Sequence, residues 1–125
     1  MTTVLLIDAP IAVRHALRRR LSLEPDLTIV GEVDDGWQAV KLAELLDPDV
    51  VVLDAEMPDL DVQLVVRALS QLDPYRGIVV VSQHREAVTQ SLEGTASLVV
   101  GKHEGLAPLV GAIRSAARRP HGRLD

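Results

Sequence analysis

The chain has 125 residues, a length typical of one domain, and its 13 basic and 18 acidic side chains leave a net charge of -5. Apolar residues make up 47% and charged residues 25% of the chain, a composition that excludes general disorder, collagen and coiled coil. The absence of cysteine excludes disulfides and thiolate catalysis and fits a reducing compartment, and no apolar stretch approaches the roughly 18 residues of a membrane span.

Short apolar runs alternate with amphipathic segments along the chain. The runs are rich in Val, Ile and Leu and lack polar alternation, as in strands that are buried on both faces of a parallel sheet. In chain order, the predicted strands cover residues 4–7, 28–30, 50–53, 78–81 and 98–100.

The segments between these runs have apolar residues at helical spacing. In the first segment, Leu17 and Leu21 lie four residues apart, whereas the fourth, residues 84–93, has only Val88 and Leu92 as apolar anchors. Strands that alternate with helices in this way predict an α/β fold with a parallel sheet, right-handed crossovers and helices on both faces. The anchors of the other predicted helices are residues 39, 43 and 46, residues 62, 65, 66 and 69, and residues 109, 113, 116 and 117.

Polar side chains follow several of these runs, at the point where each run ends. Asp8 follows the first run and Asp54 follows the third. Ser82 follows the fourth run and Lys102 follows the fifth. Because ligands of open α/β sheets bind beyond the carboxyl ends of the strands, we expect these side chains to converge. Carboxylates suit Mg²⁺, a hydroxyl and an ammonium suit phosphate oxygens, and a carboxylate can form an aspartyl-phosphate, so the pattern predicts a phosphoryl-transfer site.

The stretches around these residues resemble the receiver domains of two-component response regulators, and the NarL/LuxR-type subfamily most. Residues 5–10 are similar to the family's first strand and acidic pair, and the most specific stretch is residues 48–61. Residues 95–97, ahead of Lys102, resemble the run into the family's lysine. The resemblance extends from residue 3 to about residue 118. It implies a flavodoxin-like (βα)5 fold, a doubly wound parallel five-stranded sheet with the strand order 2-1-3-4-5.

The resemblance implies a switch and not an enzyme. A sensor histidine kinase would pass a phosphoryl group to Asp54, Mg²⁺ would bridge the acidic residues and the phosphate, and Lys102 would pair with a phosphate oxygen. Ser82 would move toward the phosphate and shift the face formed by the fourth helix, the fifth strand and the fifth helix. The family also implies a cytoplasmic homodimer without a membrane anchor, which reaches DNA only through a helix-turn-helix output domain outside this chain.

Several departures from the family pattern predict an atypical receiver with a degenerate acidic pocket. The second acid after the first strand, usually the direct metal ligand, is replaced by Ala9, so Mg²⁺ binding at Asp8 and Asp54 should be weak. Glu56 either compensates as an extra metal ligand or faces solvent. Gln83 could crowd the pocket.

Two further departures concern the switch itself. Val99 stands where the family often has an aromatic residue that reports phosphorylation, so no such side chain can swing inward. The spacing from Ser82 to Lys102 is two residues short of the family pattern, which predicts a truncated or irregular fourth helix.

Plainer interpretations of the same residues stay open. Asp54 and Lys102 could form an ion pair that no longer accepts phosphate. Asp8 and Ser82 could cap the first and fourth helices, a common role for these residue types. We predict a receiver domain over residues 1–119, followed at 120–125 by a tail or by the start of a linker to an output domain that this chain lacks.

The main hypothesis is an atypical receiver that controls transcription through protein–protein contacts, with weak or absent phosphorylation of Asp54. The alternative is a conventional Mg²⁺-dependent receiver that a histidine kinase switches. A remote alternative is an aspartate-nucleophile phosphatase, because residues 53–56 faintly resemble the nucleophile motif of haloacid-dehalogenase-type enzymes. That motif expects aspartate at the position of Glu56 and opens its domain, whereas this stretch lies in the middle of the chain.

Overall fold

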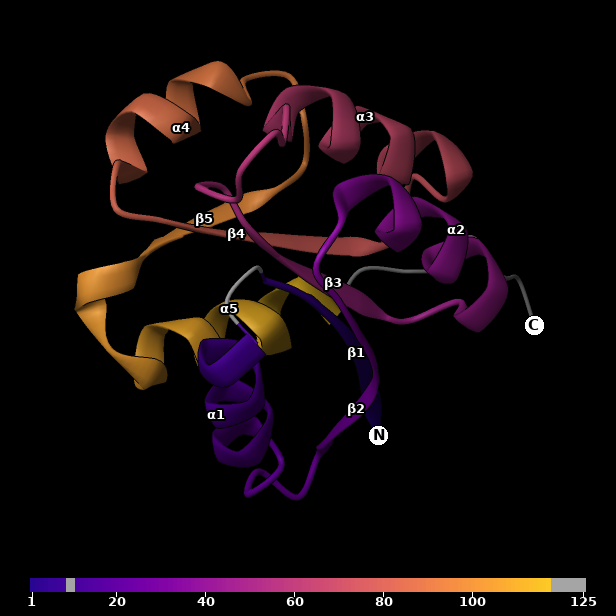
Figure 1. Ribbon diagram of the computed structural model, residues 1–125, viewed down its shortest axis with the longest axis vertical. Coiled ribbons are helices and arrows are strands. Elements are labelled where there is room, and N and C mark those ends of the chain that lie inside the picture. Colours follow the sequence, from indigo (N-terminus) through magenta and orange to yellow (C-terminus); the bar gives the residue numbers. More distant parts are fainter. Residues whose placement is uncertain (9–10, 118–125) are drawn as a thin grey trace.

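The computed structural model describes residues 1–8 and 11–117, and these residues form a parallel sheet flanked by helices (Figure 1). The sheet has five strands in the order β2-β1-β3-β4-β5, which confirms the predicted fold class and strand order. Ala9 and the predicted tail lie outside the described residues. The strands are β1 (Thr2–Ile7), β2 (Leu27–Val33), β3 (Val50–Asp54), β4 (Gly77–Ser82) and β5 (Leu98–Gly101).

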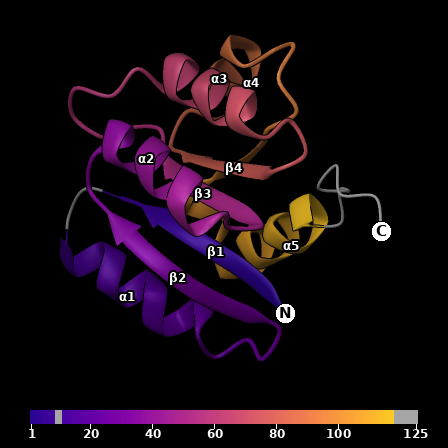
Figure 2. The same ribbon diagram turned by 90° about the vertical axis from the view of Figure 1, so that its right-hand side faces the viewer.

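Helices cover both faces of the sheet, as the alternating pattern predicted. Within the described part of the chain, α2, α3 and α4 lie on one face, and α1 and α5 lie on the other (Figures 1 and 2). Each of these helices is too short or too polar to traverse a lipid bilayer. The helices are α1 (Ile11–Leu21), α2 (Gly36–Leu46), α3 (Val62–Leu72), α4 (Arg85–Ser91) and α5 (Leu106–Ala117), and the short 3-10 helix η1 spans Lys102–Glu104.

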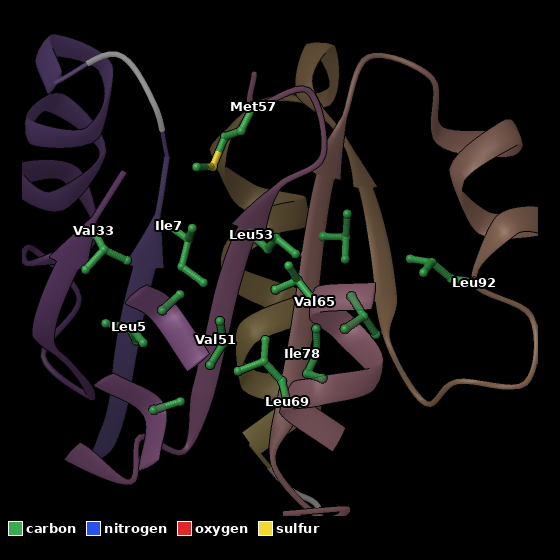
Figure 3. Packing of buried hydrophobic residues seen from close by; sticks show 14 residues of the cluster. Leu5, Ile7, Val33, Val51, Leu53, Met57, Val65, Leu69, Ile78 and Leu92 are labelled. Atoms are coloured by element: carbon green, nitrogen blue, oxygen red, sulfur yellow. The ribbon is translucent and has the colours of Figure 1, made fainter. Parts of the chain in front are cut away.

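The strands supply a separate core to each layer of helices. Successive side chains of a strand point to opposite faces, so Leu5 and Ile7 of β1 pack toward α2 and α3, whereas Val4 and Leu6 pack toward α1 and α5. Figure 3 shows the first of these cores, in which Leu53 of β3 and Leu92 at the end of α4 also take part. All the residues of β3 are buried, which agrees with its unbroken apolar sequence.

The starts of α2 and α3 follow capping chemistry, and the start of α4 does not. The side chain of Asp35 accepts backbone hydrogen bonds at the start of α2, and Asp61 does the same for α3. By contrast, α4 begins after His84 without a side-chain cap, and none of its residues is buried. The predicted helix at residues 84–93 is therefore seven residues long, in agreement with the expected truncation.

Two contacts tie α5 to the rest of the molecule. Gly77 opens β4 directly under α5, where a Cβ atom on the glycine would lie 2.7 Å from the Cβ of Ala116. At the outer side of α5, Arg114 forms ion pairs with Glu24 at 2.8 Å and with Asp26 at 2.9 Å, both in the turn between α1 and β2. These contacts join parts of the chain that are far apart in sequence.

Candidate functional site

The structure brings four of the predicted site residues together at the carboxyl edge of the sheet. Asp54 ends β3, Ser82 ends β4, and Lys102 follows β5 as the first residue of η1. Glu56 lies in the loop after β3. The contacts among them are direct, because Lys102 Nζ lies 2.7 Å from Asp54 Oδ1 and 3.1 Å from Glu56 Oε1.

The Asp54 carboxylate is held firmly by its surroundings. Asp54 is only 8% exposed, at the end of a strand whose residues are all buried. Its Oδ1 accepts a hydrogen bond of 2.9 Å from the backbone N–H of Glu56, in addition to the contact with Lys102. The ion pair that we considered as a plainer interpretation is therefore present, and it leaves the acceptor role of Asp54 as a prediction.

The Glu56 carboxylate is engaged by a ring of hydrogen-bond donors. Ser82 Oγ–H donates to Oε2 at 2.6 Å, and the backbone N–H of Gln83 donates to Oε1 at 2.8 Å. Burial raises the pKa of Glu56, but the hydrogen bonds from Ser82, Gln83 and Lys102 outweigh burial and leave the pKa lowered. The carboxylate is therefore a bound anion, although Glu56 as a residue is exposed, as the solvent-facing interpretation expected.

Ser82 and Lys102 complete this arrangement. Ser82 is fully buried, and its Oγ accepts a hydrogen bond of 2.8 Å from the backbone N–H of His84, which precedes α4. Burial lowers the pKa of Lys102, but contacts with Asp54 and Glu56 outweigh it and raise the pKa. Ser82 thus links the acidic site to the residue before α4. It is not the helix cap that the plainer interpretation predicted, because the N-cap position is His84, which makes no side-chain capping bond.

Asp8 borders a cavity beside Asp54 whose walls do not include Glu56. Asp8, Asp54 and Lys102 line a cavity of about 440 Å³ whose other walls are mainly apolar side chains of β1, β3 and α5. Glu56 and Ser82 are not among the lining residues. The Asp8 backbone is fixed in place, because its carbonyl accepts a hydrogen bond of 2.7 Å from Arg14 Nη1.

The donor set fits Mg²⁺ only in part. Two carboxylates, those of Asp8 and Asp54, line the same cavity, and Mg²⁺ in proteins is commonly held by one or two carboxylates together with water. The oxygens of Glu56 already accept hydrogen bonds from other groups. Among the described residues, no three His, Cys, Asp or Glu side chains are grouped in a way that could hold a metal ion.

Three other positions, Gln83, Val99 and Ala9, also depart from the family pattern. Gln83 is exposed and contributes its backbone N–H to Glu56, and crowding of the pocket by its side chain stays a prediction. Val99 is half-buried and packs against the core next to α3 and α4. The replaced acid, Ala9, lies outside the described residues.

Sequence reasoning missed the contacts that hold Glu56. The interpretation considered the side chain as a metal ligand or as a solvent-facing group, and it did not consider donors from β4. A signal was available, because Ser82 and the backbone N–H of Gln83 follow the neighbouring strand and point to the same edge of the sheet. A carboxylate two residues beyond Asp54 can reach that edge.

Known proteins resemble the chain over most of its length. The sequence model of the response regulator receiver domain matches residues 4–114. The nitrate/nitrite response regulator protein NarL of Escherichia coli K12 is 36% identical over 117 residues, which cover 92% of this chain and 54% of NarL. The transcriptional regulatory protein DegU of Brevibacillus brevis is 31% identical over 117 residues, which cover 92% of this chain and 50% of DegU. The chain thus spans about half the length of these two relatives.

Solved structures agree with this result. The response regulator domain of Thermotoga maritima CheB superposes with a TM-score of 0.83 at 28% identity, over 96% of this chain and 98% of that domain. The NarL signal receiver domain of Mycobacterium tuberculosis superposes with a TM-score of 0.78 at 30% identity, over 98% of both chains. Since both the family model and these relatives cover nearly the whole described fold, the chain belongs to the response regulator receiver domains and is of the NarL/LuxR type.

Proposed function

We propose that this chain is the receiver part of a transcription regulator that acts through protein–protein contacts, and that Asp54 accepts a phosphoryl group slowly or not at all. The proposal rests on one observation. The acceptor carboxylate is nearly buried, and within the described part of the chain its ion-pair partner is Lys102, which it shares with the second carboxylate of Glu56. A site of this kind carries more negative charge than its one ammonium can offset.

Charge is the physical reason for slow transfer. The donor's phosphoryl group is an anion, and it has to approach Asp54 past the like charge of Glu56. The ammonium that would attract it is already divided between two carboxylates. Mg²⁺, when held by Asp8 and Asp54, would offset part of the charge of the incoming group. With Ala9 at the position of the second acid, this offset is weaker than in the family pattern.

The partners follow from the same assignment. The relatives NarL and DegU are named as a response regulator and a transcriptional regulatory protein, and each is about twice as long as the matched segment. We therefore assign DNA contact to a helix-turn-helix output domain outside this chain. A homodimer, a sensor histidine kinase as partner and a cytoplasmic location belong to the same proposal. In this role the chain is a binding switch and catalyses no turnover of its own.

Intact mass after incubation with acetyl phosphate and Mg²⁺ tests the proposal. We expect the parent protein to gain little or no phosphoryl mass, and the Asp54→Asn variant to gain none. Rapid and complete addition of one phosphoryl group to the parent, lost in Asp54→Asn, would contradict slow acceptance and restore the conventional switch. Steady turnover of p-nitrophenyl phosphate that disappears in Asp54→Asn would instead support the phosphatase alternative.

A further inference from the structure

The carboxylate of Glu56 lies where the oxygens of a phosphoryl group on Asp54 would find their donors. We infer that Glu56 occupies this phosphate-binding position, which we call the seat and which is formed by Ser82, Gln83 and Lys102. The chain's own carboxylate thereby takes the place of the phosphoryl group and blocks phosphorylation of Asp54. This inference rests on the proposed function, because it takes Asp54 as the acceptor. It adds a specific cause, a positioning residue that competes with the phosphoryl group.

The donors around Glu56 are those that bind an oxyanion. A buried hydroxyl, a backbone N–H and an ammonium contact its two oxygens, at 2.6 Å from Ser82, 2.8 Å from Gln83 and 3.1 Å from Lys102. This combination of a hydroxyl, an amide and an ammonium is suited to phosphate oxygens, which form short, charge-assisted hydrogen bonds. All three donors come from the carboxyl ends of β4 and β5, beside the end of β3 that carries Asp54.

The seat cannot serve both anions. Lys102 Nζ contacts both Asp54 Oδ1 and Glu56 Oε1, so the two carboxylates share one ammonium group. A phosphoryl group adds a charge of about -1.5 to -2 near neutral pH. Placed on Asp54, it would need the donors that Glu56 now occupies and would repel the Glu56 carboxylate. Phosphorylation therefore requires Glu56 to leave Ser82, Gln83 and Lys102.

The filled seat also fixes the start of α4. The hydroxyl of Ser82 donates to Glu56, and its oxygen accepts the backbone N–H of His84. His84 is the N-cap position of α4, which has no side-chain cap of its own. Through this hydroxyl, Glu56 holds the helix start in one position without phosphate. The site and the α4 face are thus already connected in the unmodified chain.

The rate of phosphoryl labelling in Glu56 variants tests the inference. In the labelling reaction, an Asp54 carboxylate oxygen bonds to the phosphorus of acetyl phosphate, the bond between phosphorus and the acetyl oxygen breaks, and acetate leaves with the electron pair. We expect Glu56→Ala to gain phosphoryl mass at least about tenfold faster than the parent, the change that corresponds to losing one charge-assisted hydrogen bond. Glu56→Gln keeps the shape of the side chain but not its charge, so its labelling rate should lie between those of the parent and Glu56→Ala.

The matched control is Glu93→Gln, which neutralises an exposed carboxylate outside the site and should label at the parental rate. Asp54→Asn combined with Glu56→Ala should not label at all. Slow labelling of both the parent and Glu56→Ala would overturn the inference while leaving the proposed slow acceptor intact. Fast labelling of the parent would instead overturn the proposed function.

A spectroscopic measurement without phosphate or Mg²⁺ provides a second readout. In ¹H–¹⁵N spectra, Glu56→Ala should shift the backbone amide resonances of Gln83 and His84, the first by losing its acceptor and the second through Ser82. Glu93→Gln should leave both resonances in place. If the Gln83 amide resonance does not move in a folded Glu56→Ala variant, the seat is not filled by Glu56 and the inference is wrong.

Discussion

Lys102 is the residue on which the charge balance of the site depends. Its ammonium lies between Asp54 and Glu56, and the side chain of Asp54 is only 10% exposed. A buried carboxylate that loses its cationic partner keeps the cost of its desolvation and gains nothing in return. Lys102 therefore stabilises the fold at this edge of the sheet, independently of any phosphate.

Replacing Lys102 should measurably destabilise the protein at neutral pH. We expect Lys102→Met to lower the free energy of unfolding by roughly 1–3 kcal/mol, the usual cost of leaving a buried acceptor unsatisfied. Urea unfolding followed by circular dichroism measures this difference. The control is Lys41→Met on the exposed side of α2, which should stay within about 0.5 kcal/mol of the parent. Equal losses in the two variants would contradict the stabilising role.

The sequence identified this site well at some residues and poorly at others. Asp54, Ser82 and Lys102 could be predicted because each follows an apolar run, and the ends of parallel strands meet at one edge. The contacts of Glu56 could not, because they depend on the direction of a loop side chain. That direction follows from where the neighbouring strand ends and where α4 begins, which is tertiary information.

Among the helices and strands, β4 and α5 are in close contact at Gly77. Gly77 allows it, since a Cβ atom there would lie 2.7 Å from the Cβ of Ala116 and 3.0 Å from its carbonyl carbon. Real Cβ atoms do not approach so closely, and the atoms that a Cβ would meet include the backbone of Ala116, which cannot turn away as a flexible side chain can. By contrast, a Cβ atom on Gly111, on the exposed side of α5, would meet no atom within 4 Å.

Two glycine-to-alanine variants should therefore have opposite effects on stability. Gly77→Ala is expected to lower the free energy of unfolding by roughly 1–3 kcal/mol, as overpacking usually does. Gly111→Ala should raise it by roughly 0.5–1 kcal/mol, because glycine is entropically costly inside a helix. Thermal or urea unfolding of both proteins gives the comparison. A stabilising Gly77→Ala would mean that α5 can shift outward more easily than its contacts suggest.

At the same scale, α4 shows why helix ends are difficult to predict. The apolar anchors Val88 and Leu92 suggested a helix over residues 84–93, whereas the helix ends at Ser91. Leu92 is buried although it lies beyond the last helical residue. An apolar residue at helical spacing thus indicates burial and does not show that the helix continues. The cap predicted at Ser82 did not fix the start either, because the N-cap position is His84.

Across the whole molecule, Arg114 connects α5, the last helix, to the turn between α1 and β2. Its guanidinium donates to Asp26 at 2.9 Å and to Glu24 at 2.8 Å, both in the turn before β2. The hydrogen bond from Arg114 is the main reason that the pKa of Asp26 falls from 3.8 to about 2, against desolvation, which raises it. The same contacts raise the pKa of Arg114.

The lowered pKa of Asp26 predicts a pH-dependent contribution to stability. Because the folded pKa lies below the unfolded value, the contribution is fully present above pH 3.8 and is lost as the pH falls toward about 2. Arg114→Gln should therefore lower the Tm slightly at pH 7, and this difference from the parent should shrink over that acidic range. Arg67→Gln, on the exposed side of α3, serves as the control. A Tm difference that is constant from pH 7 to the acid limit would contradict the assignment.

The burial of β3 has a consequence for how the molecule can respond at its site. Asp54 ends a strand that lies between β1 and β4 and is buried throughout, so its position is as fixed as the core. The opposite side of the site belongs to the edge strand β5 and to α4. None of the residues of α4 is buried. Weakly packed segments are displaced at lower cost than a central strand. We therefore expect a structural change that starts at Asp54 to have a direction, outward to α4 and β5, while β1, β2 and α1 stay in place.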